Sequence, residues 1–229
     1  MSKRYPTLAY ETRLLEDGHT HIAGLDEAGR GAWAGPVSAA ATILPLHDPG
    51  LSQRLSDVCD SKMCTPRQRD RLFDLIRATA TAWSISLISA ARIDEIGIVP
   101  ATQEAMCAAV SMLAPAPDVL LIDALRLPAL SIDQQSIAKG DQQCLTIAAA
   151  SILAKVARDR AMIALDRHYG AYGLARHKGY GTRQHRQALV DLGPTDIHRW
   201  YFAPVAQVAQ VKQMVPPRVS LAPHRKDSR

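Results

Sequence analysis

Short apolar runs alternate along the chain with polar segments rich in glycine and proline. Runs of four to eight apolar residues bounded by turn residues predict strands. We expect strands at residues 21–25, 37–44, 83–89, 119–122 and 136–138. A glycine-rich turn joins the first two strands, which favours a hairpin.

Longer segments show the spacing of apolar residues that is typical of helices. The strongest covers residues 145–168, which are rich in alanine and contain no glycine or proline. Thr65-Pro66 marks another helix start, because Thr suits the N-cap and Pro suits the first helical position. The expected helices are residues 7–16, 66–80, 102–113, 145–168 and 184–192.

The order of these elements predicts an α/β fold. Hairpin strands come first and strands that alternate with helices follow, which favours a mixed β-sheet flanked by helices. The helices after residue 145 would add a C-terminal helical cap. We expect residues 1–206 to form one domain and residues 207–229 to form a flexible basic tail, because the tail holds a Pro-Pro pair and many cations.

Composition and charge narrow the class of protein. Of 229 residues, 47% are hydrophobic and 21% are charged, which excludes a wholly disordered or fibrous chain. The net charge is +5, and the segment from Lys212 to Arg229 holds five cations and one anion, so the rest of the chain is near neutral. No cysteine pair has CxxC spacing, no apolar signal segment begins the chain, and no apolar run is long enough to span a membrane. These features predict a cytoplasmic protein with reduced thiols.

Four carboxylates stand beside predicted strand ends or before the long helix. Asp26 and Glu27 follow the first strand, Asp123 follows residues 119–122, and Asp141 precedes the helix at 145. Ligands gather at strand ends in α/β sheets, and oxygen donors without a His or Cys cluster favour Mg²⁺ or Mn²⁺ over zinc. Each residue also fits a turn or a cap, and Asp141 fits an N-cap of the long helix. The residues alone leave both interpretations open.

The adjacent pair carries a geometric condition. Neighbouring residues in a strand point to opposite faces, so Asp26 and Glu27 can serve one metal cluster only if the strand ends or bends there. Gly29 and Gly31 follow the pair and allow such a bend, because glycine tolerates positive φ.

Several motifs follow one another along the chain in a specific order. They are Gly24-Leu25-Asp26-Glu27-Ala28-Gly29-Arg30-Gly31 with Gly35-Pro36-Val37, then Asp60-Ser61-Lys62, Leu121-Ile122-Asp123, Lys139-Gly140-Asp141 with the long helix, and His177-Lys178-Gly179-Tyr180-Gly181-Thr182. Together they resemble the ribonuclease HII family, over roughly residues 8–206. Two departures, Ala124 and the Met63-Cys64 pair, remove no functional group.

The resemblance implies a ribonuclease-H-like fold and a metal-dependent endoribonuclease. Such an enzyme hydrolyses the RNA strand of RNA/DNA hybrids and incises duplex DNA at single embedded ribonucleotides, leaving 5′-phosphate and 3′-hydroxyl ends by two-metal-ion catalysis. Asp26, Glu27, Asp123 and Asp141 are then the metal ligands, with Mn²⁺ or Mg²⁺ as the cofactor. The implied partners are the hybrid and the ribonucleotide-containing duplex, with no membrane, and the implied state is a monomer.

The resemblance also implies substrate-binding residues. Gly29, Arg30 and Gly31 match the loop that reads the 2′-hydroxyl, Tyr180 matches the tyrosine at the RNA–DNA junction, and Ser61 and Lys62 suit phosphate contacts. Without the motifs, Tyr180 would be interpreted as a half-buried core residue, Lys62 as solvated surface and Ser61 as a turn cap.

Two rival functions remain at this stage. One is a catalytically silent hybrid-binding protein, which the presence of all four acidic positions disfavours. The other is the related ribonuclease HIII group, which carries an extra N-terminal domain, whereas only 25 residues precede Asp26. Irregular spacing argues against zinc at His177, His185 and His198, which we interpret as hydrogen-bonding or phosphate-contacting residues of the cap.

Overall fold

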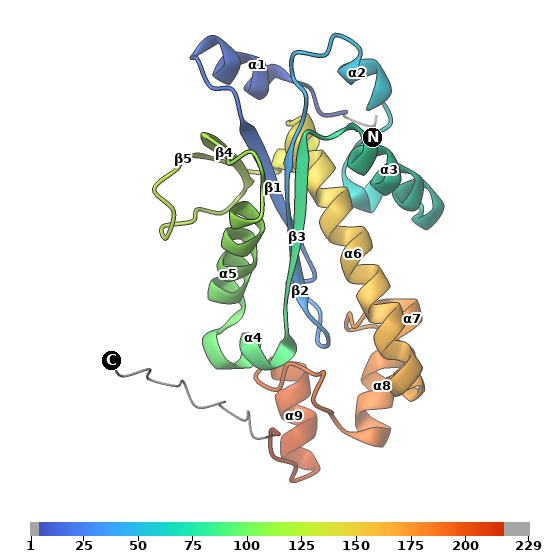
Figure 1. Ribbon diagram of the computed structural model, residues 1–229. Helices are drawn as coiled ribbons and strands as arrows, with labels where there is room; N and C mark the ends of the chain where they lie inside the picture. The colour runs from blue at the N-terminus through green and yellow to red at the C-terminus, as the bar shows by residue number, and fades with distance from the viewer. Residues whose placement is uncertain (1–4, 218–229) are drawn as a thin grey trace, which may run out of the picture.

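The computed structural model describes residues 5–217 and contains one five-stranded sheet in the order β3-β2-β1-β4-β5 (Figure 1). The chain therefore has the mixed sheet flanked by helices that the sequence predicts. The strands are β1 (Ile22–Ala28), β2 (Val37–Ile43), β3 (Ala82–Ile88), β4 (Val119–Asp123) and β5 (Asp133–Ile137).

Strand pairing positions the end of β1 at an opening in the sheet. β1 pairs with β2 as an antiparallel hairpin as far as Ala28 opposite Ser38. On its other side β1 pairs in parallel with β4, but only as far as Leu25 opposite Ile122. The last three residues of β1 therefore extend past the point where β4 stops pairing with it.

Helices cover both faces of the sheet and extend below it (Figure 1). The α-helices are α1 (Ala9–Glu16), α2 (Leu51–Arg54), α3 (Pro66–Thr79), α4 (Ala90–Ile96), α5 (Ile98–Ser111), α6 (Leu145–Tyr169), α7 (Leu174–His177), α8 (Arg183–Leu192) and α9 (Ala203–Val211). Three 3₁₀ turns accompany them: η1 (Ser61–Met63), η2 (Gly140–Gln142) and η3 (Gly170–Tyr172). The helices after α6 pack at one end of the molecule as the predicted C-terminal cap.

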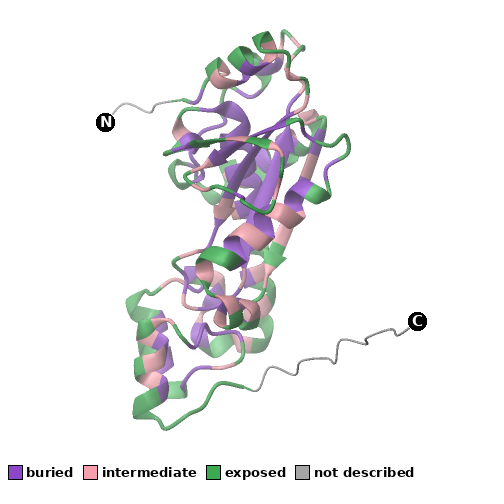
Figure 2. Cartoon of the chain, turned by 90° about the vertical axis from the view of Figure 1, so that its left-hand side faces the viewer, coloured by how far each residue is buried: buried purple, intermediate pink, exposed green. Residues whose placement is uncertain are grey.

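The two sheet faces follow from the alternation of β1. Leu25 packs in a buried cluster with Met106 and Ala109 of α5. Gly24 faces α6, where a Cβ atom would lie 2.3 Å from the carbonyl carbon of Thr146. Only glycine lets strand and helix backbones approach this closely. The buried core accordingly runs through the sheet and along α6 (Figure 2).

Several boundaries differ from the sequence-based expectations. β1 continues through Asp26 and Glu27, which were expected to follow it, because its pairing with β2 persists beyond the apolar run. α5 begins at Ile98, four residues early, and α4 before it was not predicted; Ser89 caps α4 and Gly97, at φ +86°, separates the two helices.

The C-terminal boundary also differs in detail. Helix α9 spans Ala203–Val211 and so crosses the expected division between residues 206 and 207. Residues 218–229 of the expected tail lie outside the described residues. The division into one domain and a tail stays a prediction.

A local signal at the start of α3 agrees with the structure. Thr65 accepts a hydrogen bond from the Gln68 amide while the Gln68 side chain accepts from the Thr65 amide, which forms a capping box at α3. The four cysteines form no disulfide. Within residues 5–217, no helix has both the length and the apolar character needed to cross a membrane.

Candidate active site

The four predicted carboxylates lie around the carboxyl ends of the neighbouring strands β1 and β4. Asp26 and Glu27 belong to the last part of β1, Asp123 is the final residue of β4, and Asp141 lies in the η2 turn before α6. Asp123 Oδ1 accepts a hydrogen bond from the Gly140 amide at 2.7 Å. This bond ties the end of β4 to the turn that carries Asp141.

Asp26 is buried beneath the sheet edge, as Asp141 is. It lies on the face of β1 that Gly24 presents to α6, and its Oδ1 accepts the Glu27 amide at 2.7 Å. Burial raises the pKa of Asp26 well above its ordinary value, and the negative charges of Glu27 and Asp123 add to the shift. The Ser151 hydroxyl on α6 opposes it. A charged Asp26 therefore needs a cation at this place.

Glu27 lies on the opposite face of the strand, as the alternation of side chains requires. Its Oε1 atom forms an ion pair with Arg30 at 3.3 Å. Its Oε2 atom is buried and has no hydrogen-bond partner among the described residues. Burial raises the pKa of Glu27, although the Arg30 cation opposes the shift. The unpartnered oxygen has the donor chemistry that a divalent cation requires.

Asp141 does not cap the long helix. Cys144 holds the N-cap position of α6. Instead, Glu11 of α1 accepts hydrogen bonds from the amide and the hydroxyl of Thr146, at 2.8 and 2.6 Å, and thereby satisfies the helix start. The alternative interpretation of Asp141 as a helix cap is therefore wrong.

Asp141 lies instead among other charged groups. Burial raises its pKa to about 6, and the nearby carboxylates of Asp60 and Asp123 contribute. Lys62 Nζ approaches Asp141 Oδ2 at 3.9 Å and opposes the shift. Asp60 is thus a fifth carboxylate of this region, and the sequence interpretation did not place it there. Its position before the Ser61–Lys62 pair was the signal that could have found it.

The carboxylates lie in the same region, but they are not close enough together to form a metal-binding cluster. Among residues 5–217, no three His, Cys, Asp or Glu side chains are grouped closely enough to hold a metal ion. The opposite faces of Asp26 and Glu27 account for part of this separation. The residues nevertheless fit a divalent cation, because oxygen donors predominate, burial raises the pKa of three of them, and one buried oxygen has no partner.

The loop after β1 is held by two buried arginines. Arg199 donates to the carbonyls of Arg30 at 2.8 Å and of Gly35 at 3.1 Å. Arg158 donates to the carbonyls of Ala34, Pro36 and Lys178. Burial, with the Arg158 cation beside it, lowers the pKa of Arg199 to about 9, which still leaves the guanidinium charged at neutral pH.

The two glycines that flank Arg30 differ in their structural role. Gly29 has φ +95°, and a Cβ atom there would lie 1.8 Å from Arg158 Nε, so the fold itself requires glycine. A Cβ atom at Gly31 would meet no atom within 4 Å. The fold does not require glycine at residue 31, and the open space there can admit a ligand.

Ser61 and Lys62 begin the η1 turn, which Asp60 caps through the Lys62 amide at 2.9 Å. Ser61 is buried and its hydroxyl bonds to Ser151 at 3.1 Å. The Lys62 side chain is 81% exposed and reaches toward Asp141. The structure therefore brings Lys62 to the carboxylates and places Ser61 beneath the turn.

Tyr180 lies at the edge of the site and is half-buried. Its ring centroid is 5.5 Å from Lys155 Nζ and 5.3 Å from Arg158 Cζ. The Tyr180 carbonyl accepts from the Thr182 amide at 2.8 Å and lies 3.1 Å from His185 Nδ1. The backbone of this residue is therefore fixed, while two cations lie over its ring.

The three histidines of the cap form a buried network behind Tyr180. His177 stacks on His185 with ring centroids 4.5 Å apart. His185 Nε2 lies 3.2 Å from His198 Nε2, and His198 Nδ1 lies 3.0 Å from the Thr195 amide. This arrangement confirms hydrogen bonding within the cap. The network and the buried arginines had no periodic signal in the sequence.

Comparisons with known proteins agree on one family. The Ribonuclease HII family model matches residues 23–205. A ribonuclease HII from Roseiflexus castenholzii is 50% identical over 204 residues, which cover 89% of this chain and 91% of that protein. A ribonuclease HII from Halalkalibacterium halodurans is 47% identical over 208 residues, covering 90% and 76% of the two chains.

Two solved structures share the fold at lower sequence identity. The crystal structure of ribonuclease H2 from Pyrococcus horikoshii matches with a TM-score of 0.69 and 25% identity, over 85% of this chain and 99% of that chain. The ribonuclease HII in a PCNA complex from Archaeoglobus fulgidus matches with a TM-score of 0.66 and 25% identity, over 82% and 96% of the chains.

Proposed function

The chain belongs to the ribonuclease HII family of metal-dependent endoribonucleases acting on RNA/DNA hybrids, and on that premise we propose that it incises duplex DNA at single embedded ribonucleotides. The observation that carries the proposal is the juxtaposition of an acidic strand edge with a glycine loop held by buried arginines. The first supplies a place for the reaction, and the second supplies rigid backbone groups for recognising a sugar.

The residues that would hold divalent cations are Asp26, Glu27, Asp123 and Asp141. The unpartnered Glu27 oxygen and the raised pKa of Asp26 support this assignment, since both are relieved by a bound cation. We infer Mn²⁺ or Mg²⁺, because the donors are oxygens. When bound, a pair of such ions supplies an activated water and charge for the departing 3′-oxygen.

The chain itself supplies position and selectivity. Arg199 bonds to the Arg30 carbonyl, and Arg158 bonds to the Ala34 carbonyl further along the same loop. These bonds support a role for the backbone amides of Gly29, Arg30 and Gly31 in binding a sugar 2′-hydroxyl. Open space at Gly31 lets the sugar approach the backbone. Lys62 neutralises part of the acidic edge and can contact a phosphate, and Ser61 supports the turn that carries it.

Tyr180 is proposed to stack on the sugar that follows the ribonucleotide. Its fixed backbone and half-buried ring support this role, because a stacking residue must be held in place to discriminate. Action as a monomer is part of this proposal. The products would carry 5′-phosphate and 3′-hydroxyl ends.

The test is incision of a DNA duplex that carries one ribonucleotide, with Mn²⁺ or Mg²⁺ present. We expect one cut at the ribonucleotide, a 5′-phosphate on one product, and no cut in the matching all-DNA duplex. Cleavage of long hybrids together with an intact single-ribonucleotide duplex would contradict the proposal. It would leave membership of the family unaffected.

A further inference from the structure

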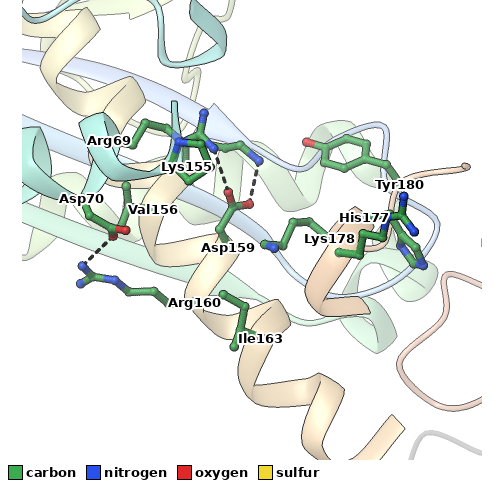
Figure 3. A pocket seen from close by; sticks show the side chains of 12 residues that line it. Arg69, Asp70, Lys155, Val156, Asp159, Arg160, Ile163, His177, Lys178 and Tyr180 are labelled. Atoms are coloured by element: carbon green, nitrogen blue, oxygen red, sulfur yellow. Dashed lines mark hydrogen bonds and ion pairs between the residues drawn. The ribbon is translucent and has the colours of Figure 1, made fainter. Parts of the chain in front are cut away.

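A pocket of about 450 Å³ lies beside Tyr180, between α3, α6 and α7 (Figure 3). Residues of all three helices and the Tyr180 loop line it. Five cationic side chains face two carboxylates in the lining, which contains Arg69, Asp70, Lys155, Asp159, Arg160, Arg176 and Lys178. The sequence interpretation assigned no role to this group.

The concentration of positive charge here is unusual for this chain. The whole protein has a net charge of +5, and the segment from Lys212 onward accounts for most of it. The body of the protein is near neutral, so an excess of three cations in one pocket is a local positive field. Such a field attracts a polyanion.

Part of the pocket is rigid. Arg69 Nη1 donates to the carbonyls of Ser61 at 3.0 Å and of Cys64 at 2.7 Å, and its other terminal nitrogen lies 3.7 Å from Asp159. Lys155 bonds to the same carboxylate at 2.7 Å. These contacts fix the two cations before a ligand arrives.

The rest of the pocket is available. Arg176 is exposed and forms no ion pair within residues 5–217, while Lys178 Nζ bonds only to the carbonyl of Ala175. Arg160 pairs with Asp70 at 3.0 Å, and both side chains are at least half exposed. An exposed pair of this kind exchanges readily for a stronger anion.

The pocket joins the proposed substrate path at two places. Lys155 stands between Asp159 and the Tyr180 ring, with its Nζ 5.5 Å from the ring centroid. Arg69 contacts the backbone of the turn that carries Lys62. A strand that leaves the carboxylates and passes Tyr180 therefore enters this pocket next.

We propose that this pocket binds backbone phosphates of the DNA that follows the embedded ribonucleotide beyond Tyr180. The inference rests on the proposed function, which places the junction at Tyr180. Arg176 and Lys178 contact phosphate directly, and Arg69 and Lys155 provide fixed positive charge beneath it. These contacts hold the duplex in register without reading its sequence.

The test compares Arg176→Gln with Arg13→Gln. The second variant removes the same charge from an exposed residue of α1 that has no ion pair among residues 5–217, and α1 lies away from α7 in the fold (Figure 1). Steady-state cleavage of a single-ribonucleotide duplex should show KM raised roughly threefold to fivefold in Arg176→Gln, with kcat unchanged. The log–log salt dependence of binding should become shallower by ~0.9. Arg13→Gln should match the wild type, and Arg176→Lys should recover most of the affinity.

A second substrate locates the contact. When the DNA beyond the ribonucleotide is shortened to the one nucleotide whose sugar would stack on Tyr180, wild type and Arg176→Gln should have equal KM, because the phosphates that distinguish them are gone. Equal KM on the long duplex, or an equal loss on both duplexes, would overturn the proposal. A competition experiment tests for a small-anion site instead. Such a site is indicated if inorganic phosphate displaces the long duplex from the wild type more than chloride of equal ionic strength does, and has no such effect on Arg176→Gln.

A direct measurement of binding keeps the test of the pocket separate from the test of the proposed function. Fluorescence anisotropy of the same duplexes measures affinity whether or not they are cut. If the wild type leaves the single ribonucleotide intact, the proposed function fails. The difference between Arg176→Gln and Arg13→Gln in binding the long duplex still decides whether the pocket takes DNA phosphates.

Discussion

The ring nitrogens of His185 and His198 that face each other lie 3.2 Å apart, so one of them must donate and the other accept. Thr195 donates its amide to His198 Nδ1, which leaves the proton of His198 on Nε2. His185 Nδ1 faces the Tyr180 carbonyl and therefore carries the His185 proton. A chain of bonds with a single direction thus runs from Thr195 through two neutral rings to Tyr180.

We expect this chain to make stability fall with decreasing pH. Burial lowers the pKa of His185 to about 4 and that of His198 to about 3, and each ring's neighbouring histidine contributes to the shift. The unfolded chain takes up these protons near pH 6.5, whereas the folded chain does not. The stabilisation is complete above pH 6.5 and is lost progressively as pH falls toward 4.

Denaturant unfolding at a series of pH values from 7 to 4 measures this effect. His198→Gln removes one of the two titrations, so its stability should depend less steeply on pH in this window. Asp196 acts on the pKa of His198 in the opposite direction, and its removal should extend the loss of stability to lower pH. The raised pKa values of Asp26, Glu27 and Asp141 act in the opposite direction, so the comparison with His198→Gln is decisive. Equal pH dependence of stability in the wild type and His198→Gln would contradict the neutral pair.

Asp123→Asn should abolish cleavage while the fold persists. Asparagine keeps the oxygen that accepts the Gly140 amide, but it removes a negative charge that now raises the pKa of Asp26, Glu27 and Asp141. We expect activity to fall by orders of magnitude and the melting temperature without metal to rise or stay the same. Mn²⁺ should stabilise the wild type more than the variant. An unchanged Mn²⁺ shift would contradict the assignment of Asp123 as a ligand.

Tyr180→Ala should impair incision at a lone ribonucleotide more than it impairs binding of duplex DNA. A stacking contact contributes ~1–3 kcal/mol, which is roughly fivefold to a hundredfold in rate. Tyr180→Phe keeps the ring and serves as the control for the hydroxyl. The measurement is kcat/KM on single-ribonucleotide and long-hybrid substrates. Equal rates for Tyr180→Ala and wild type on the first substrate would remove the role given to the ring.

The glycines on either side of Arg30 should respond differently to alanine. Gly29→Ala places a Cβ atom against Arg158 at positive φ, so we expect it to cost ~1–3 kcal/mol of folding free energy or more. Gly31→Ala meets open space and should unfold like the wild type. Its methyl group should instead block the sugar and reduce incision at the ribonucleotide. Thermal unfolding and incision assays on both variants separate the two effects, and a fully active Gly31→Ala would contradict close approach there.

The sequence predicted the elements whose signals are local. The β1–β2 hairpin, the capped start of α3 and the long α6 all follow from turn residues, caps and periodicity. The end of β1 was misplaced, because the apolar run stops at Leu25 although hydrogen bonding to β2 continues to Ala28. Pairing with a partner strand can extend a strand through charged residues, and a single strand's pattern does not contain that information.

In the candidate site, too, the residues with a local signal were predicted and the long-range contacts were not. The four carboxylates were found from their place at strand ends and from the family motifs, and their role as ligands stays a prediction. Asp60 was missed, because its interaction with Asp141 joins residues far apart in the sequence. The buried arginines were missed for the same reason, since Arg158 and Arg199 bind carbonyls more than a hundred residues away. Helical periodicity gives no sign that a cation within α6 is buried.

The bonds from Arg199 to the loop after β1 also have a consequence for the timing of synthesis. The carbonyls of Arg30 and Gly35 are separated from Arg199 by 169 and 164 residues. A ribosome adds ~5–20 residues per second, so the loop waits roughly ten to thirty seconds for its anchor. All four carboxylates are present only in the last part of that interval, because Asp123 and Asp141 follow the loop in the chain and precede Arg199. Arg158 precedes Arg199 in the chain and bonds to the carbonyls of Ala34 and Pro36, so the loop gains its first anchor earlier than its second during synthesis.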